Sequence, residues 1–278
     1  MTAVLPRRAL LTATAALMLP RSLRAAGTAR LITIGAPTTE IVYALGGGDQ
    51  VVATDTTSRF PQAAAALPKV GYMRTLSAEG LMSLAPSRVI AQEGSGPPEV
   101  LARLRDAGIP VDEVPDRPDV ATLEAKVTLI AARLGRVTEG VKLAAELRRG
   151  LDRPLRTDGP SVLCLIHPGG GGWMAAGGDT VPDLLIRLAG GRNAMDFTGI
   201  KALSLEAAIA AGPQVLVVSA NALAQAGGMD GLLALPHLSA TPAAAARRVV
   251  VVEAQMLLGL GPRSPEAVDR LAAGLAPA

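Results

Sequence analysis

The chain has 278 residues, of which 49% are hydrophobic and 18% charged, a composition that is typical of a folded protein and excludes a disordered one. This length is sufficient for two lobes, each with its own core. The formal net charge is only +3, and several of the arginines lie in the first 26 residues, so the remainder is close to neutral and nucleic acid is excluded as a partner.

Residues 1–26 have the features of an export signal. Arg7 and Arg8 precede an apolar core at residues 9–19, and small residues end the segment. The core is shorter than the roughly 20 residues that a membrane-spanning helix needs. The adjacent arginines leave the general (Sec) and the twin-arginine (Tat) export routes open. The only cysteine, Cys164, is far from this segment, so we predict a periplasmic protein without a lipid anchor.

Residues 27–136 are predicted to form an N-terminal lobe in which strands and helices alternate. Apolar, β-branched runs that alternate with helical segments indicate a parallel sheet covered on both faces. The expected strands are 31–34, 51–54, 88–91 and 109–114, and the expected helices are 38–45 and 98–107.

The strongest helical periodicity lies between Val120 and Arg153, where apolar residues recur every three or four positions. Gly135 interrupts it, so the pattern predicts one helix that ends near Leu134 and a second that begins near Val137. We expect residues 137–153 to form the connecting backbone, with a helix from about Val137 to Leu151 that would span roughly 22 Å at about 1.5 Å per residue. That length suits a rigid strut between two lobes.

Residues 154–278 are predicted to form a C-terminal lobe with the same alternation. Its first strand ends at His167 and is followed by a glycine-rich stretch. The expected strands are 161–166, 215–219 and 248–253, and the expected helices are 181–188 and 264–275.

Two stretches 127 residues apart align without a gap: LSAEGLMSLAPSRVI from Leu76 and LSLEAAIAAGPQVLV from Leu203. Each is typical of a short amphipathic helix followed by a buried parallel strand. Because Glu79 aligns with Glu206, each predicted lobe carries a carboxylate at an equivalent place. The repeat therefore favours a surface for a two-sided partner, although a solvated helix face is the ordinary interpretation of such glutamates.

Tyr72 is one of two tyrosines and stands in VGYMRTLSAEG, just before the first copy of the repeat. Loops at the carboxyl edge of a parallel sheet are where such folds hold ligands. A phenolate oxygen suits ferric iron, including the iron of haem, and Arg74 would favour the ionised phenol. From these residues alone, a tyrosine that caps a core is the ordinary interpretation.

Five motifs together resemble those of the haem-binding subunits of bacterial haem-import ABC transporters, which are class III periplasmic binding proteins. They are DTTSRFP at 55–61, PKVGYMRTLSAEGL at 68–81, MAAGGDT and RLAGGRNAM between 174 and 195, and LLGLGPRSPEA at 257–267. The resemblance runs from about residue 30 to residue 275. It implies an α/β fold of two Rossmann-like lobes with parallel sheets, joined by a long rigid helix.

The resemblance also implies roles for individual residues. Tyr72 would be the axial ligand of ferric haem b (hemin), with Arg74 as its hydrogen-bonding neighbour. Glu79 and Glu206 would dock onto an ABC permease, which works with its ATPase and, indirectly, with an outer-membrane haem uptake system. His167 would hold the same haem or a second one, so that the transported ligand is one or two haems. A strand-end histidine with a backbone hydrogen bond is the alternative for His167.

Three further residues are expected to contact haem. Trp173 and Met174 follow the glycines and are suited to pack on a porphyrin face, where apolar contact supplies most of the binding energy, or else to fill the core. Arg263 is a candidate partner for the haem propionates, as are Lys69 and Arg59, and the sequence does not choose among them.

Other classes of function have less support. A binding protein for a ferric siderophore or cobalamin remains the alternative, since it needs the same two lobes but no bond from the protein to the metal. The sequence contains no P-loop, CxxC, HExxH or GxSxG motif. The glycines of HPGGGGWM lack the spacing of a dinucleotide-binding turn. We therefore expect a binding protein and not an enzyme.

Overall fold

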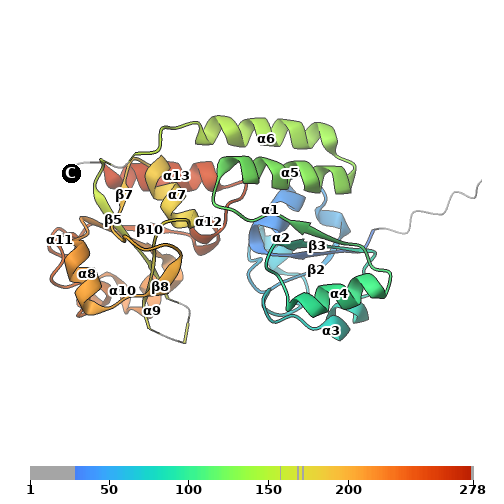
Figure 1. The fold of residues 1–278 in the computed structure, drawn as a ribbon, viewed down its shortest axis with the longest axis horizontal. Coiled ribbons are helices and arrows are strands. Elements are labelled where there is room, and N and C mark those ends of the chain that lie inside the picture. Colours follow the sequence, from blue (N-terminus) through green and yellow to red (C-terminus); the bar gives the residue numbers. More distant parts are fainter. Residues whose placement is uncertain (1–28, 157, 168, 171, 277–278) are drawn as a thin grey trace, which may run out of the picture.

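The computed structural model describes residues 29–276 except 157, 168 and 171. They form two α/β lobes side by side, with helices laid across one side of both (Figure 1). The predicted export signal lies outside the described residues. Among the helices of the described part, none is long and apolar enough to cross a membrane.

The first lobe is built on a four-stranded sheet in the order β2-β1-β3-β4, and all its neighbouring strands are parallel. Alternate residues of β1 enter different cores: Leu31 packs with residues of α1 and α5, whereas Ile32 and Ile34 pack with residues of α3 and α4. The predicted two-sided covering is therefore confirmed. The elements are β1 (Leu31–Ile34), α1 (Ala36–Ala44), the 3-10 helix η1 (Gly48–Gln50), β2 (Val51–Thr54), α2 (Gln62–Ala65), α3 (Ala78–Ser83), β3 (Arg88–Gln92), α4 (Pro98–Asp106) and β4 (Val111–Val114).

The predicted pair of central helices is present as α5 (Val120–Leu134) and α6 (Val137–Leu151). Gly135 ends α5 in the left-handed conformation, with φ of 68°, a geometry that glycine adopts without strain. The chain then turns back, so α6 lies along α5 and continues toward α13 (Ser264–Leu275) of the second lobe (Figure 1). Because α6 packs on a helix of each lobe, it forms the connecting spine.

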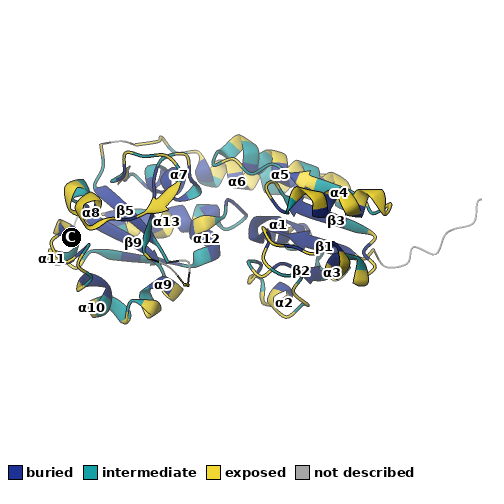
Figure 2. Cartoon of the chain, turned by 60° about the horizontal axis from the view of Figure 1, so that its bottom comes forward, coloured by how far each residue is buried: buried dark blue, intermediate teal, exposed yellow. Residues whose placement is uncertain are grey.

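The second lobe contains a six-stranded sheet in the order β10-β9-β5-β6-β8, with the short β7 also paired to β5. Its inner strands are buried, whereas the helices show exposed outer faces (Figure 2). The elements are β5 (Ser161–Ile166), β6 (Met174–Ala176), α7 (Val181–Leu188), β7 (Arg192–Asn193), β8 (Ile200–Ala202), α8 (Leu205–Ala211), β9 (Val215–Ser219), α9 (Ala220–Gln225), α10 (Gly228–Leu233), α11 (Pro242–Ala245), β10 (Val249–Val252) and α12 (Ala254–Leu258).

The second sheet corrects the expectation of wholly parallel sheets. β5, β9, β10 and β7 pair in parallel, but β6 pairs antiparallel with both β5 and β8. β5 ends at Ile166 and β6 begins at Met174, so the connection between them is short. A connection of this length reverses direction, whereas a parallel neighbour needs a crossover of a dozen residues or more.

The aligned repeat has the same local structure in both lobes. Its first copy forms α3 and β3, and its second forms α8 and β9. The shared serine is the helix N-cap in each: the side chain of Ser77 accepts a hydrogen bond from the amide of Gly80, and that of Ser204 accepts one from Ala207. This capping satisfies amides that have no partner within the helix.

Candidate functional site

A cleft of about 780 Å³ lies between the two lobes. Its walls include the carboxyl ends of strands from both sheets, namely Gln92 at the end of β3, Ile166 at the end of β5 and Ser219 at the end of β9. This is where open α/β sheets bind ligands. The volume is within the range of about 300–1,000 Å³ that is typical of small-molecule and cofactor sites.

The structure brings Tyr72 and Arg74 to the wall of this cleft, on the first lobe. Tyr72 lies in a turn closed by a hydrogen bond from the Thr75 amide to its carbonyl, and 46% of its surface is exposed. Its ring is therefore neither buried in the lobe nor excluded from the cleft. Within the described residues, the structure has no hydrogen bond between the side chains of Tyr72 and Arg74, a contact that the sequence analysis expected.

His167 lines the same cleft from the second lobe. The amide of Gly169 donates a hydrogen bond to its Nδ1 at 3.2 Å, which is the backbone contact considered as the alternative. With Nδ1 accepting, the proton of a neutral ring is on Nε2. Trp173 meets the His167 ring edge to face, with the ring centroids 4.9 Å apart. Trp173 is partly buried against the core of the second lobe and does not line the cleft, and neither does Met174, at the start of β6.

Arg263 is also absent from the residues that line the cleft. Its guanidinium is held by Glu40 and Glu253, and it lies over the ring of Phe60, 3.8 Å from the centroid. Lys69, a second candidate for the propionates, donates hydrogen bonds to Thr54, Ser58 and Ala64 inside the first lobe. Of the three basic candidates, the structure places only Arg59 on the cleft wall.

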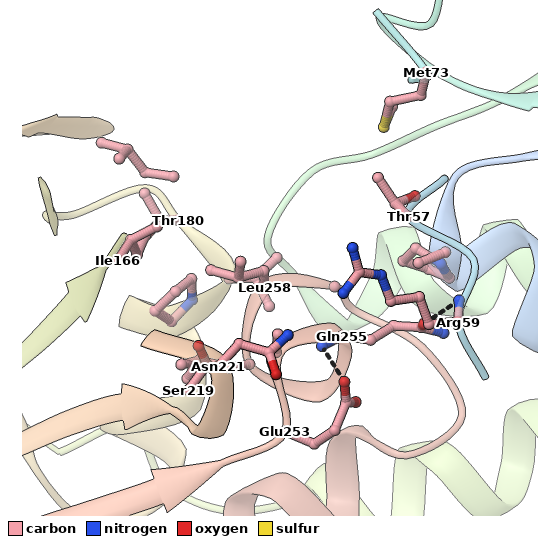
Figure 3. Close-up of a pocket in the computed structure, with 18 of the residues that line it drawn as sticks. Thr57, Arg59, Met73, Ile166, Thr180, Ser219, Asn221, Glu253, Gln255 and Leu258 are labelled. Atoms are coloured by element: carbon pink, nitrogen blue, oxygen red, sulfur yellow. Dashed lines mark hydrogen bonds between the residues drawn. The ribbon is translucent and has the colours of Figure 1, made fainter. Parts of the chain in front are cut away.

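Figure 3 shows side chains that line the cleft. Arg59 extends from the first lobe into the space that Asn221 enters from the second, and Leu258 lies between the lobes. Asn221 and Gln255 were not predicted, and no motif marks them, whereas Leu258 lies in the LLGLGPRSPEA motif but was not singled out. A signal did exist for Ser219, because it ends a predicted strand at the edge where such sheets bind ligands.

Two acidic residues of the cleft wall have cationic partners. Asp116 accepts hydrogen bonds from the Nζ of the fully buried Lys126 and from Gln92. Glu253 pairs with Arg263 at 3.1 Å. A buried cation next to a carboxylate offsets its charge. Lys126 therefore reduces the repulsion that Asp116 exerts on an anionic ligand, whereas Arg263 is shared between Glu253 and Glu40 and offsets their charge only in part. The other charged residues of the cleft wall are Arg59, Arg74 and Asp179.

The two glutamates of the repeat lie on the outer surface. Glu79 and Glu206 are in the first turns of α3 and α8, and both are exposed. Backbone hydrogen bonds at the helix starts, followed by bonds from Ser77 and Ser204, lower the pKa of each carboxyl. Both helices lie on the side of the molecule away from α6 (Figure 1). The surroundings of the two glutamates differ: Glu79 pairs with Arg103 at 3.6 Å, whereas Glu206 follows Leu205, an exposed apolar residue.

Comparison with known proteins agrees with this architecture. The model of a family described as periplasmic binding protein matches residues 31–256. The apo structure of the periplasmic heme-binding protein RhuT from Roseiflexus sp. RS-1 is 36% identical, covers 90% of this chain and 100% of its own, and superposes with a TM-score of 0.82. The periplasmic heme-binding protein BhuT, solved with two hemes, is 41% identical over 89% of this chain and 99% of its own, with a TM-score of 0.81.

A curated relative extends the similarity beyond solved structures. The uncharacterized ABC transporter substrate-binding lipoprotein YvrC of Bacillus subtilis is 26% identical over 262 residues, which are 89% of this chain and 80% of that protein. The family and these neighbours are substrate-binding transport proteins. The chain therefore belongs to the periplasmic binding protein family, in the class III group whose lobes are joined by a long helix.

Proposed function

We propose that this protein binds haem in the inter-lobe cleft and delivers it to an inner-membrane ABC permease. The observation that carries the proposal is Tyr72: a half-exposed phenol on the cleft wall, in the Gly-Tyr-x-Arg motif. A phenolate is a hard anionic donor that suits ferric iron. The heme-binding neighbours support the same ligand.

In this proposal Tyr72 provides the bond to iron and Arg74, on the same wall, stabilises the phenolate charge. Arg59 and Arg74 supply positive charge for the carboxylates of the haem, while Lys126 offsets the charge of Asp116 and Arg263 offsets that of Glu253 in part. The porphyrin would pack on the apolar groups of the cleft, where burial contributes most of the binding free energy.

His167 is the proposed contact of the second lobe. To bind iron through Nε2, the neutral ring must carry its proton on Nδ1, and the hydrogen bond from the Gly169 amide must then break. As a ligand His167 would therefore need a local rearrangement, whereas Tyr72 is already exposed in the cleft. We accordingly assign the iron bond of the first haem to Tyr72 and a second, stacked haem to His167. Trp173 would set the position of the His167 ring.

Delivery would follow docking of both lobes on the permease. Glu79 and Glu206 occupy equivalent places on the two lobes and are ionised at neutral pH, and their lowered pKa values extend the ionised form to lower pH. They suit basic side chains on a two-sided partner. Export to the periplasm by residues 1–26, without a lipid anchor, completes the proposal.

A hemin titration with absorbance readout tests the iron bond. We expect Tyr72→Phe to remove the charge-transfer band of the phenolate complex and to weaken hemin binding by about 100-fold or more, since even an outer-shell partner is worth about 10- to 100-fold in metal affinity. Tyr43, the other tyrosine, lies on α1 away from the cleft, so Tyr43→Phe is the matched control and should leave both readings unchanged.

Two results would contradict the proposal. Full hemin affinity with an unaltered spectrum in Tyr72→Phe would remove the iron ligand from this residue. If mixing the natural protein with hemin leaves the hemin spectrum unchanged while cobalamin or a ferric siderophore binds, the cargo belongs to that alternative class, whose members need no bond from the protein to the metal.

A further inference from the structure

The lobes meet at a second place besides the spine, and a buried ion pair lies at its centre. Glu40 belongs to α1 of the first lobe, and Arg263 directly precedes α13 of the second. Arg263 donates from Nη2 to Glu40 Oε1 at 2.6 Å and from Nε to Oε2 at 3.1 Å, a bidentate geometry. The side chains are only 17% and 6% exposed, so this pair is far less screened by solvent than surface pairs.

Gln255 extends this contact to the cleft wall. Its Nε2 donates to Glu40, while its Oε1 accepts the backbone amides of Arg59 at 3.0 Å and Phe60 at 3.2 Å. Both amide ends of one second-lobe residue are thus bonded to the first lobe. Because Arg59 and Gln255 both line the cleft, the ion pair is connected to the wall on which the ligand would rest.

Shape complementarity reinforces the polar contacts. A Cβ added at Gly259 would lie 2.7 Å from Cγ of Pro37, and one at Gly261 would lie 3.5 Å from Pro37 Cα. The chain just before Arg263 therefore packs directly on the start of α1. Arg263 also stacks on Phe60. Loss of either partner of a buried pair of this kind leaves an uncompensated buried charge, which strongly destabilises the contact.

We propose that Glu40 and Arg263 form an inter-lobe latch, which sets the spacing of the two cleft walls, and that Arg263 is a positioning residue for haem capture. The second clause rests on the proposed function. Neither residue lines the cleft. Both therefore affect a ligand indirectly, because Gln255 connects Glu40 to the backbone of Arg59 and Phe60. The latch also explains the LLGLGPRSPEA motif: its glycines leave space for Pro37, and its arginine forms the ion pair with Glu40.

The latch is tested first without any ligand. Spin labels on cysteines introduced at the exposed Ala102 and Ala210 report the distance between the outer surfaces of the lobes, and the buried Cys164 does not react. We expect Arg263→Gln and Glu40→Gln to broaden the distance distribution. Arg270→Gln is the matched control, because Arg270 pairs with Glu266 on the exposed face of α13. An unchanged distribution in both latch variants would overturn the proposal.

The consequence for binding is tested with hemin and with hemin dimethyl ester, which lacks free propionates. We expect Arg263→Gln and Glu40→Gln each to raise the dissociation rate of both ligands on the order of tenfold, because changes to such a site act mainly on the off-rate. The phenolate band should persist. Arg263→Lys, which keeps the charge but loses the bidentate geometry, should show a smaller effect and serves if Arg263→Gln does not fold.

The outcomes separate the alternatives. A loss confined to the propionate-bearing ligand, with Glu40→Gln neutral, would make Arg263 a propionate contact and refute the positioning role. If the natural protein does not bind hemin, the proposed function fails, while the label distances still decide whether the latch exists.

Discussion

Gly140 offers a quantitative test of how the spine is packed. It lies on α6, and a Cβ at this position would be 2.4 Å from the Cβ of Ala131 on α5, whereas ordinary contacts begin near 3.4 Å. Gly140→Ala must therefore push the helices apart. Overpacking of this kind costs about 1–3 kcal/mol. Because the overlap is about 1 Å, the upper part of the overpacking range applies, about 2–3 kcal/mol. The better helix propensity of alanine returns up to about 1 kcal/mol. We expect a net loss of about 1–2 kcal/mol, measured by urea unfolding followed by circular dichroism.

A second glycine supplies the control. Gly80 lies on α3, where an added Cβ would come no closer than 3.7 Å to Ser77, and the second copy of the repeat has Ala207 at the equivalent place. Gly80→Ala should thus be neutral or stabilising by up to about 1 kcal/mol. If Gly140→Ala is as stable as the natural protein, or if both substitutions destabilise equally, then the close approach of α5 and α6 is not the reason that position 140 requires glycine.

Three further predictions concern charge and reactivity. Replacement of both Glu79 and Glu206 by lysine should leave hemin binding intact and abolish transport into vesicles that contain the permease. Because the pKa values of both carboxyls are lowered, docking of the natural protein should persist below the ordinary glutamate pKa of 4.5 and fail only on further acidification. Burial raises the pKa of Cys164 to about 12, so a thiol reagent at pH 8 should react only after urea unfolding. Lys126→Met should cost toward the lower end of about 3–5 kcal/mol in urea unfolding, since Asp116 is partly exposed, and adding Asp116→Asn should recover part of it.

The secondary structure was largely predictable because it depends on local patterns. Apolar β-branched runs became the buried strands β1, β5 and β9, and the interrupted periodicity at Gly135 became the turn between α5 and α6. The antiparallel β6 and β8 were not predicted. They are three residues each, and their pairing depends on a strand reversal that hydrophobic periodicity does not encode.

The binding site was predictable only where a motif marked it. Tyr72, Arg74 and His167 stand out in the sequence and do line the cleft. Arg263 stood out equally, as part of a motif, yet its guanidinium is enclosed between the lobes. A motif shows that a residue matters to the family, but it does not distinguish a contact with the ligand from a contact that holds the fold.

The sequence by itself determined the class of the fold, the repeated helix-strand unit and the residues with the chemistry to bind ferric haem. Only the tertiary structure decided that Arg59 and not Lys69 faces the cleft, that Lys126 sits behind Asp116, and that Arg263 bonds Glu40 across 223 positions of chain. The physical reason is the distance along the chain over which the interactions act. Strand and helix formation depend on neighbours a few residues away, whereas the partner of a long charged side chain depends on which distant segments the packed cores bring together.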